Sequence, residues 1–379
     1  MDFGKGVNMK KKVLFLIPNL AGGGAEKVLV NLVNNLSQDK FDVTLQTLFD
    51  VGVNKQYLLP HVRYIGGWKR QPRGMTQLMK LFSPKFLYKR IIKEKYDIVV
   101  SYLEGPTARI VAGCADENTK TVCWIHVEFL GLKNASVGFR SISEAREAYG
   151  SFDKIIAVAN TVRDDFKRWI PVKNAIDVLY NTNETEQIIQ KGQEEVNEVC
   201  FLTDKPIVCS VARLRPEKGF DTLLKVHRRL ILEGFEHRLY ILGEGSEREK
   251  LEKMIKEYSL DDSVYLLGFR KNPYAYVAKA DLYVCSSLRE GFSTAVTESL
   301  VLGVPVVTTE CSGMKELLGE HNEYGIVMEN SEDGLYEGIK AMLSNPELRA
   351  SYKEKAKERG KRFSREQTVQ AVEKMLLSL

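Results

Sequence analysis

Two carboxylates eight residues apart, Glu290 and Glu298, mark the stretch of this sequence whose residue types are best suited to chemistry. Glu290 ends a polar loop, and Glu298 falls in an amphipathic stretch that is typical of a helix. The backbone N–H groups at the start of this predicted helix attract phosphate oxygens. They would come from Gly291, Phe292, Ser293 and Thr294. A phosphate cradle between two carboxylates suits a nucleotide sugar, which carries hydroxyl groups on both sides of a diphosphate. The spacing alone also fits one exposed Glu followed by another on a helix surface.

A basic turn supplies charge of the opposite sign. Arg213 and Lys218 stand five residues apart in the run Val211–Phe220, directly after an apolar, strand-like run. Across a turn both cations can face one site, where they would neutralise the charge that builds on a departing diphosphate. Taken alone, the run also fits a solvated basic turn.

Glycine-rich loops follow several predicted strands. Gly23 and Gly24, in the loop Asn19–Glu26, allow a ligand to approach the backbone closely where a helix begins. A simple tight turn is the alternative, and the loop lacks the G-x-G-x-x-G fingerprint of dinucleotide-binding proteins. In later loops, Gly243 would let a flat base lie on the backbone, and backbone groups around Phe269 and Arg270 could read the edge of a uracil.

His126 ends a predicted strand of the first half and would point into a cleft between the two halves, although a histidine at a strand end is often structural. Asp164 and Asp165 fall on a polar helix face, where we expect surface charges. The five histidines have no metal-ligand spacing, and the chain contains no D-x-D triplet. We therefore expect no metal site.

The elements that must position these residues alternate between strands and helices. Apolar runs of four to six residues bounded by turns predict two parallel sheets. The expected strands of the first half are Val13–Pro18, Val43–Leu48, Asp97–Ser101, Thr121–His126, Lys154–Ala157 and Ala175–Leu179. Those of the second half are Pro206–Ala212, Arg238–Leu242, Val264–Leu267, Leu282–Ser286, Pro305–Thr308 and Gly325–Val327.

The expected architecture is α/β, with two doubly wound Rossmann-like domains facing each other across a cleft. Ligands in such sheets bind at the carboxyl ends of the strands, where every loop described above falls. The expected divisions are an acceptor-side domain over 9–181, a linker with a short helix over 182–204, a nucleotide-sugar domain over 205–362, and a final helical segment over 363–379.

Composition indicates a globular enzyme of the cytoplasm. The 379 residues are 44% hydrophobic and 28% charged, and no apolar run approaches the roughly 20 residues that span a bilayer. The first eight residues lack the apolar core of a signal peptide. Six cysteines without a C-x-x-C pair are best explained as reduced thiols.

The net charge of +5 is unevenly distributed. Residues 61–95 hold ten Lys or Arg and a single acid, Glu94, interleaved with large apolar side chains. Such a segment can lie on an anionic membrane, and a solvated helix face is the alternative. We expect no nucleic-acid partner, because no RNA- or DNA-binding motif accompanies the charge.

Taken together, the segments resemble family 4 of the retaining glycosyltransferases, which have the GT-B fold. The segments that carry the resemblance are Pro18–Glu26, His126, Val211–Gly219, Leu242–Gly245, Gly268–Arg270, Glu290–Glu298, Gly303–Val307 and Gly313. The run from Glu290 to Glu298 is similar to the variant found in bacterial capsule, lipopolysaccharide and glycan-assembly enzymes. Ser293-Thr-Ala departs from the Gly-Leu-Val of many members, which leaves the donor sugar open.

The resemblance implies a role for each matched residue. Glu290 would hold hydroxyl groups of the donor sugar, and Glu298 would hold the ribose diol. Arg213 and Lys218 would hold the diphosphate, and His126 would contact the sugar near the reaction centre. The final helix would cross back onto the first domain.

The expected activity is transfer, with retention, of a hexose or N-acetylhexosamine from a nucleotide sugar, most simply UDP-linked. The acceptor would be a saccharide or a polyprenyl-linked saccharide at the inner face of the plasma membrane, reached by a peripheral protein. The nucleotide sugar is a substrate, and no cofactor is expected. The alternatives are a nucleotide-sugar-binding module without transfer activity, an epimerase or a glycogen-type synthase of similar fold.

Overall fold

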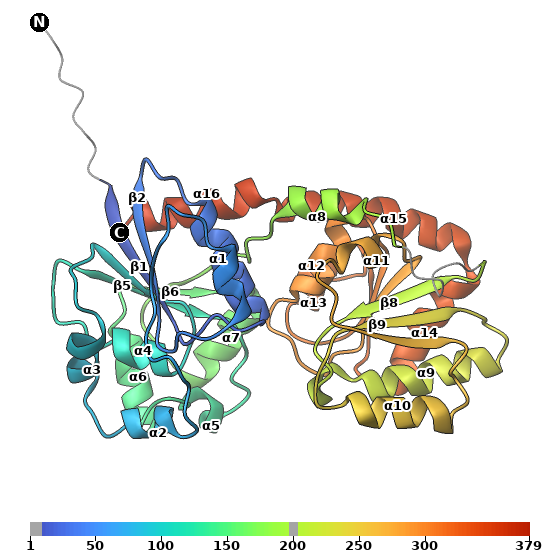
Figure 1. Cartoon of the computed structure of the whole chain (residues 1–379), viewed down its shortest axis with the longest axis horizontal. Helices are drawn as coiled ribbons and strands as arrows, with labels where there is room; N and C mark the ends of the chain where they lie inside the picture. Colours follow the sequence, from blue (N-terminus) through green and yellow to red (C-terminus); the bar gives the residue numbers. More distant parts are fainter. Residues whose placement is uncertain (1–9, 197–203) are drawn as a thin grey trace, which may run out of the picture. The chain divides into compact units, whose positions relative to one another are not determined.

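The computed structural model describes residues 10–196 and 204–379, which form two compact units. The first contains the described residues up to Thr182 together with Glu366–Leu379, and the second contains those of Asn183–Arg365. Each unit is built on one sheet with helices on both faces (Figure 1). The short helix α8, Thr185–Gly192, belongs to the second unit, and α11 and α12 of that unit pack against it.

The sheet of the first unit has the strand order β3-β2-β1-β4-β5-β6-β7, with neighbouring strands parallel. Its strands are β1 Lys11–Ile17, β2 Phe41–Thr47, β3 Arg63–Ile65, β4 Ile98–Ser101, β5 Lys120–Ile125, β6 Lys154–Ala157 and β7 Ile176–Val178. Its helices are α1 Gly24–Asn35, α2 Met75–Met79, α3 Pro84–Ile91, α4 Pro106–Val111, α5 Leu132–Ala135, α6 Ile142–Gly150, α7 Asn160–Trp169 and most of α16 Arg365–Leu377. The side chains from Val13 to Ile17 are fully buried because helices cover both faces of the sheet.

The sheet of the second unit has the order β10-β9-β8-β11-β12-β13, again with parallel neighbours. Its strands are β8 Ile207–Val211, β9 Arg238–Leu242, β10 Val264–Gly268, β11 Leu282–Cys285, β12 Val306–Thr309 and β13 Ile326–Met328. Besides α8, its helices are α9 Phe220–Leu232, α10 Arg248–Glu257, α11 Tyr274–Ala278, α12 Thr294–Val301, α13 Met314–Leu318, α14 Glu332–Ser344 and α15 Pro346–Gly360. The strand order reverses between β8 and β11, so the crevice at that point is the place where such sheets bind ligands.

The two doubly wound sheets confirm the expected fold class. Each expected strand is present to within about two residues, a deviation common at element ends. Strand β3 was not expected, since it lies inside the basic segment.

The C-terminal helix α16 is anchored to the first unit by polar contacts near its C-terminal end. Buried Glu373 accepts the backbone N–H of Ser37 at 2.8 Å and the Lys40 Nζ at 2.6 Å. Lys11 Nζ donates to the Leu376 carbonyl at 3.2 Å, where the helix dipole favours a cation. The expected return of the final helix to the first domain is confirmed.

The basic segment 61–95 is divided among several elements. Its first part forms β3, which pairs with β2, and Trp68 packs against Phe49 with ring centroids 5.9 Å apart. Its later part forms α2 and α3. The charge and the large apolar side chains therefore come together only in the second part.

Asp165 is not the surface charge that the sequence suggested. It is buried on α7, and its carboxylate accepts the backbone N–H of Phe129 at 2.6 Å and the Trp169 Nε1 at 3.0 Å. The helical pattern could not show this because the donating loop after β5 lies more than 30 residues earlier in the chain.

Two buried histidines join α9 to β9 in the core of the second unit. His237 Nδ1 lies 2.8 Å from the Phe235 carbonyl, and its Nε2 lies 2.8 Å from His227 Nδ1. The carbonyl accepts from His237, so His237 Nε2 accepts from His227 and His227 Nε2 accepts from Ser263, 2.9 Å away. Burial lowers both pKa values, that of His237 to about 4, and the pair is neutral at pH 7.

Candidate functional site

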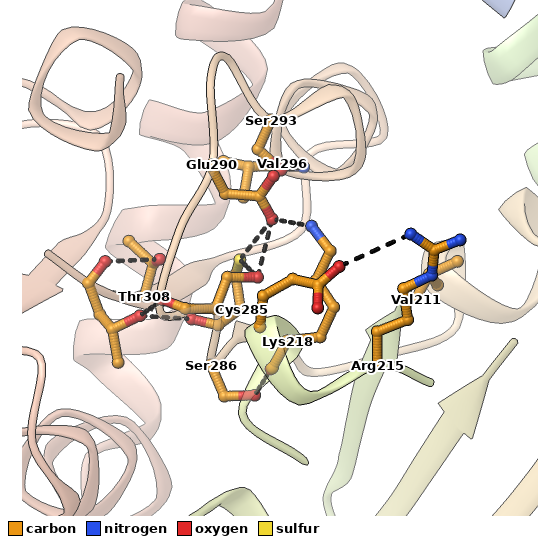
Figure 2. A network of polar contacts seen from close by, with 12 residues as sticks. Val211, Arg215, Lys218, Cys285, Ser286, Glu290, Ser293, Val296 and Thr308 are labelled. Atoms are coloured by element: carbon orange, nitrogen blue, oxygen red, sulfur yellow. Dashed lines mark hydrogen bonds and ion pairs between the residues drawn. The ribbon is translucent and has the colours of Figure 1, made fainter. Parts of the chain in front are cut away.

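The polar residues of the second unit gather at the carboxyl edge of its sheet. Lys218 follows β8 and Glu290 follows β11, the two strands that flank the reversal of strand order. Their side chains form an ion pair with Lys218 Nζ 2.6 Å from Glu290 Oε1. Figure 2 shows the two side chains pointing toward each other. They are 20% and 14% exposed, so the pair is desolvated but can still be reached by a ligand.

Glu290 is held by a second polar contact, which the sequence did not reveal. The Ser287 hydroxyl donates to the same oxygen, Oε1, at 2.7 Å. The Ser287 carbonyl in turn accepts the Thr309 hydroxyl at 2.6 Å, which fixes the loop to β12. Only the position of Ser287 directly after a buried strand could have indicated its role.

The turn that carries Lys218 requires glycine at its end. Gly219 has a φ of +62°, and a Cβ there would lie 2.2 Å from the Ser286 carbonyl oxygen. The Ser286 hydroxyl donates to the Lys218 carbonyl at 2.8 Å. These contacts hold the β8 and β11 loops together, so that Lys218 meets Glu290 across 72 residues of sequence.

The exposed Arg213 lies in the same β8 loop. In the part of the chain that the structure describes, its guanidinium forms no ion pair. Arg215, two residues further on, lies 3.8 Å from the Glu217 carboxylate (Figure 2). Arg213 is therefore a cation of this loop that a bound anion could engage.

Helix α12 begins beside Glu290. The Ser293 side chain caps it by accepting the backbone N–H of Val296 at 3.4 Å. Phe292 and Ser293 are buried, whereas Gly291 and Thr294 are half-buried. A Cβ on Gly313 would lie 2.7 Å from the Gly291 carbonyl oxygen, so two glycine-containing loops approach closely here. The first N–H groups of α12 have no partner within the helix, and an anion would bind there.

Glu298 is buried on α12, with only 8% of its surface exposed. Its Oε1 accepts the Tyr274 hydroxyl from α11 at 3.1 Å. This contact excludes the simple picture of a solvated carboxylate on a helix surface, and Tyr274 is a partner that sequence spacing did not reveal.

The loops after β9 and β10 complete this edge of the sheet. A Cβ on Gly243, which has a φ of +140°, would lie 1.9 Å from the Ala212 carbonyl oxygen. Phe269 follows the neighbouring strand β10, and 69% of its surface is exposed. Arg270 Nε donates to the Tyr276 hydroxyl at 3.1 Å. A flat backbone next to an exposed aromatic ring can accommodate a nucleobase.

His126, Gly23 and Gly24 lie in the first unit, at the carboxyl edge of its sheet. Gly23 precedes α1, and a Cβ there would lie 2.0 Å from the Glu26 carboxylate. The His126 ring is buried against Tyr102, with centroids 4.8 Å apart, and its Nε2 has no partner among the described residues. Burial lowers its pKa to about 3, so the ring is neutral and can exchange hydrogen bonds with a ligand hydroxyl.

Glu104, which follows β4, was not singled out from the sequence. Its carboxylate accepts the backbone N–H of His126 at 3.0 Å, and burial raises its pKa. It positions the end of β5, from which the histidine projects.

The described residues contain neither a metal-binding cluster nor a membrane-spanning helix. In residues 10–196 and 204–379, no group of three or more His, Cys, Asp or Glu side chains is arranged to hold a metal ion. Within the same ranges, no helix has the length and apolar character needed to cross a membrane.

Comparison with known proteins identifies the family. Residues 22–187 match the model described as Glycosyltransferase Family 4, and residues 193–359 match that described as Glycosyl transferases group 1. The chain is 30% identical to an N-acetylgalactosamine-N,N'-diacetylbacillosaminyl-diphospho-undecaprenol 4-alpha-N-acetylgalactosaminyltransferase from Campylobacter jejuni, over 97% of this chain and 100% of the relative.

Solved structures share the fold at low sequence identity. HepE from Anabaena, in complex with UDP and glucose, superposes with a TM-score of 0.77 at 20% identity over 97% of this chain and 100% of that one. Sucrose-phosphate synthase from Thermosynechococcus elongatus gives a TM-score of 0.79 at 17% identity, over 97% and 99% of the two chains. The chain therefore belongs to glycosyltransferase family 4 and has the GT-B fold, which makes it a retaining, metal-independent hexosyltransferase.

Proposed function

We propose that this enzyme transfers a hexose or N-acetylhexosamine from a UDP-linked sugar to a saccharide carried on a polyprenyl diphosphate. The main observation in favour of a nucleotide-sugar donor is the Lys218–Glu290 ion pair. It lies beside the N-terminus of α12, where the strand order reverses. The name of the Campylobacter relative supports a lipid-linked acceptor, and the UDP complex of HepE supports a uridine donor.

The residues divide the work on the donor between them. Lys218 and Arg213 neutralise charge on the departing diphosphate, whose oxygens bind at the start of α12. Glu290 holds sugar hydroxyl groups, and Glu298, oriented by Tyr274, holds the ribose diol. The exposed Phe269 and the backbone near Arg270 hold the base.

Retention follows from front-face attack, with the leaving phosphate accepting the proton of the incoming hydroxyl. In this mechanism Glu290 has no nucleophilic role and binds hydroxyl groups of the sugar, while Lys218 and Ser287 hold its Oε1 in place. The neutral His126 supplies a hydrogen bond near the reaction centre. Catalysis rests on positioning and on fixed charge.

The place of action is the inner face of the plasma membrane, with the protein peripheral and held by the basic residues of 61–95. Ten cations against one acid give that segment a net charge of +9. The single acid, Glu94, follows α3 and is paired with Arg63 of β3. A lipid-linked acceptor and anionic headgroups would be found together at this surface.

A thermal-shift screen over UDP-, GDP- and ADP-sugars tests the donor. A ligand at 100 times its dissociation constant stabilises the protein by about 2.7 kcal/mol, and we expect only UDP-sugars to do so. Release of UDP on adding a saccharide-diphospho-lipid, in excess EDTA, then tests transfer. Stabilisation without any UDP release would identify a binding module and overturn the proposal.

A further inference from the structure

Two arginine side chains donate hydrogen bonds to the turn between α2 and α3. Arg109 is buried on α4, and it donates to the Met79 carbonyl at 3.1 Å and to the Phe82 carbonyl at 2.7 Å. Arg140 donates to the two carbonyls between these, which belong to Lys80 and Leu81. The distance to the Leu81 carbonyl is 3.0 Å. Four consecutive carbonyls therefore accept from two guanidinium groups, and these charge-assisted hydrogen bonds fix the conformation of the turn.

One carboxylate organises both arginines. Glu144, on α6, accepts Arg109 Nε at 3.0 Å and Nη2 at 2.8 Å on Oε1, and it accepts the backbone N–H of Arg140 at 2.6 Å on Oε2. The Arg109 guanidinium holds the pKa of this carboxyl below its usual value despite burial. The scaffold thus connects α4 and α6 to the turn, although the three segments are far apart in sequence.

The side chains that this scaffold presents are apolar. Leu81 is 72% exposed, and Phe82 and Phe86 stack with ring centroids 5.2 Å apart while each remains about half exposed. One other exposed apolar residue lies on α2, and two lie on or just after α5, a few residues before Arg140. They are Leu78, Leu132 and Val137. Figure 1 shows α2 and α5 at the same, lower end of the first unit.

Basic residues lie on the same elements as these side chains. Lys80, Lys85, Lys89 and Arg90 lie on the turn and on α3, and Lys133 lies on α5. Among residues 10–196 and 204–379, no carboxylate forms an ion pair with any of them. Exposed apolar side chains on a fixed turn, with unpaired cations on the same elements, have the chemistry that binds an anionic bilayer, with apolar side chains below the headgroups and cations among them.

We propose that this apolar corner, formed by Leu78, Leu81, Phe82, Phe86, Leu132 and Val137, inserts into an anionic membrane. This inference rests on the proposed membrane location and makes it more specific. The contact is no longer the whole of 61–95 but two segments, the α2–α3 region and the region around α5, which Arg140 connects. Trp68 lies outside it. Arg109, Arg140 and Glu144 are positioning residues, since they act by holding the turn.

Vesicle co-sedimentation tests the corner with the full chain. We expect binding to vesicles of phosphatidylcholine with phosphatidylglycerol but weak binding to phosphatidylcholine alone. Replacing Leu81 and Phe82 by Ser should lower the affinity by about ten-fold or more, because two apolar side chains no longer leave water. Leu232→Ser is the matched control, because Leu232 is 75% exposed on α9 of the second unit. It should bind as the wild type does.

Two outcomes would overturn the inference. One is wild-type vesicle affinity in the Leu81→Ser, Phe82→Ser variant. The other is a lipid-free dimer in sedimentation velocity that this variant abolishes, which would make a second copy of the chain the occupant. UDP release with a water-soluble saccharide acceptor should be unchanged in the variant. In the wild-type protein, normal transfer without binding to anionic vesicles likewise refutes the corner but leaves the proposed function intact. Binding of the wild type to vesicles without transfer from any UDP-sugar refutes the proposed function.

Discussion

Replacing Lys218 by Ala should reduce both stability and turnover, by different amounts and for different reasons. Its Nζ lies 2.6 Å from Glu290 Oε1, and the two side chains are 20% and 14% exposed. The variant leaves Glu290 partly buried with only the Ser287 hydroxyl and the Cys285 thiol beside it, since the described residues offer it no second cation. Exposed pairs contribute about 0–1 kcal/mol and breaking a buried one costs about 3–5, so we expect a loss of about 2 kcal/mol.

Lys218→Ala should lower kcat by more than its loss of stability can explain. Removing one fixed group that stabilises transition-state charge lowers kcat by roughly 10²-fold or more. In the double variant Lys218→Ala, Glu290→Gln, the unpaired charge is gone. We therefore expect its unfolding free energy to return to within about 1 kcal/mol of the wild type. Its kcat should stay low, because the cation is still missing.

Urea denaturation measures the first quantity, and UDP release under saturating substrates measures the second. Lys225→Ala is the matched control, since Lys225 forms a 4.0 Å pair with Glu332 on the surface and both side chains are about half exposed. That variant should change neither quantity appreciably. A folded Lys218→Ala protein with near-normal kcat would refute the assignment. Recovery of kcat in the double variant would show that the pair is only structural.

Three further results are expected. Glu298→Ala should weaken the binding of UDP itself in calorimetry, while Glu290→Ala should leave it within a few-fold; equal losses would contradict the division of roles. His237 is neutral and buried with its pKa lowered from 6.5 to about 4, so the unfolded chain binds more protons between these values. The contribution of His237 to stability is therefore fully present above about pH 6.5, and about 3 kcal/mol of it should be lost on acidification to pH 4, which urea titrations of the wild type and of His237→Gln at several pH values can measure. A flat profile that His237→Gln leaves unchanged would exclude this source. Glu373→Ala removes the contacts to Ser37 and Lys40, and hydrogen exchange in α16 should accelerate; unchanged protection would show that apolar packing alone holds the helix.

The sequence by itself determined the architecture, because its signals are local. Short runs such as Val13–Ile17 are apolar at every position and bounded by turns, which is typical of a strand buried on both faces, and helical patterns fill the intervals between them. The same locality places Lys218 and Glu290 in loops that follow strands. The carboxyl ends of parallel strands share one edge, so their neighbourhood could be expected before any contact was known.

Only the tertiary structure decided which polar groups meet. Tyr274 on α11 meets Glu298 on α12, and Ser287 turns back onto Glu290 within one loop; neither residue type carries a signal of its own. Asp165 looked like a surface charge because helical spacing shows which face a residue occupies but not what covers that face. Likewise, charge counting found the basic segment, but the arginines that fix its turn come from α4 and from the residues before α6. Hydrogen bonds between distant segments depend on three-dimensional register, which a one-dimensional pattern does not contain.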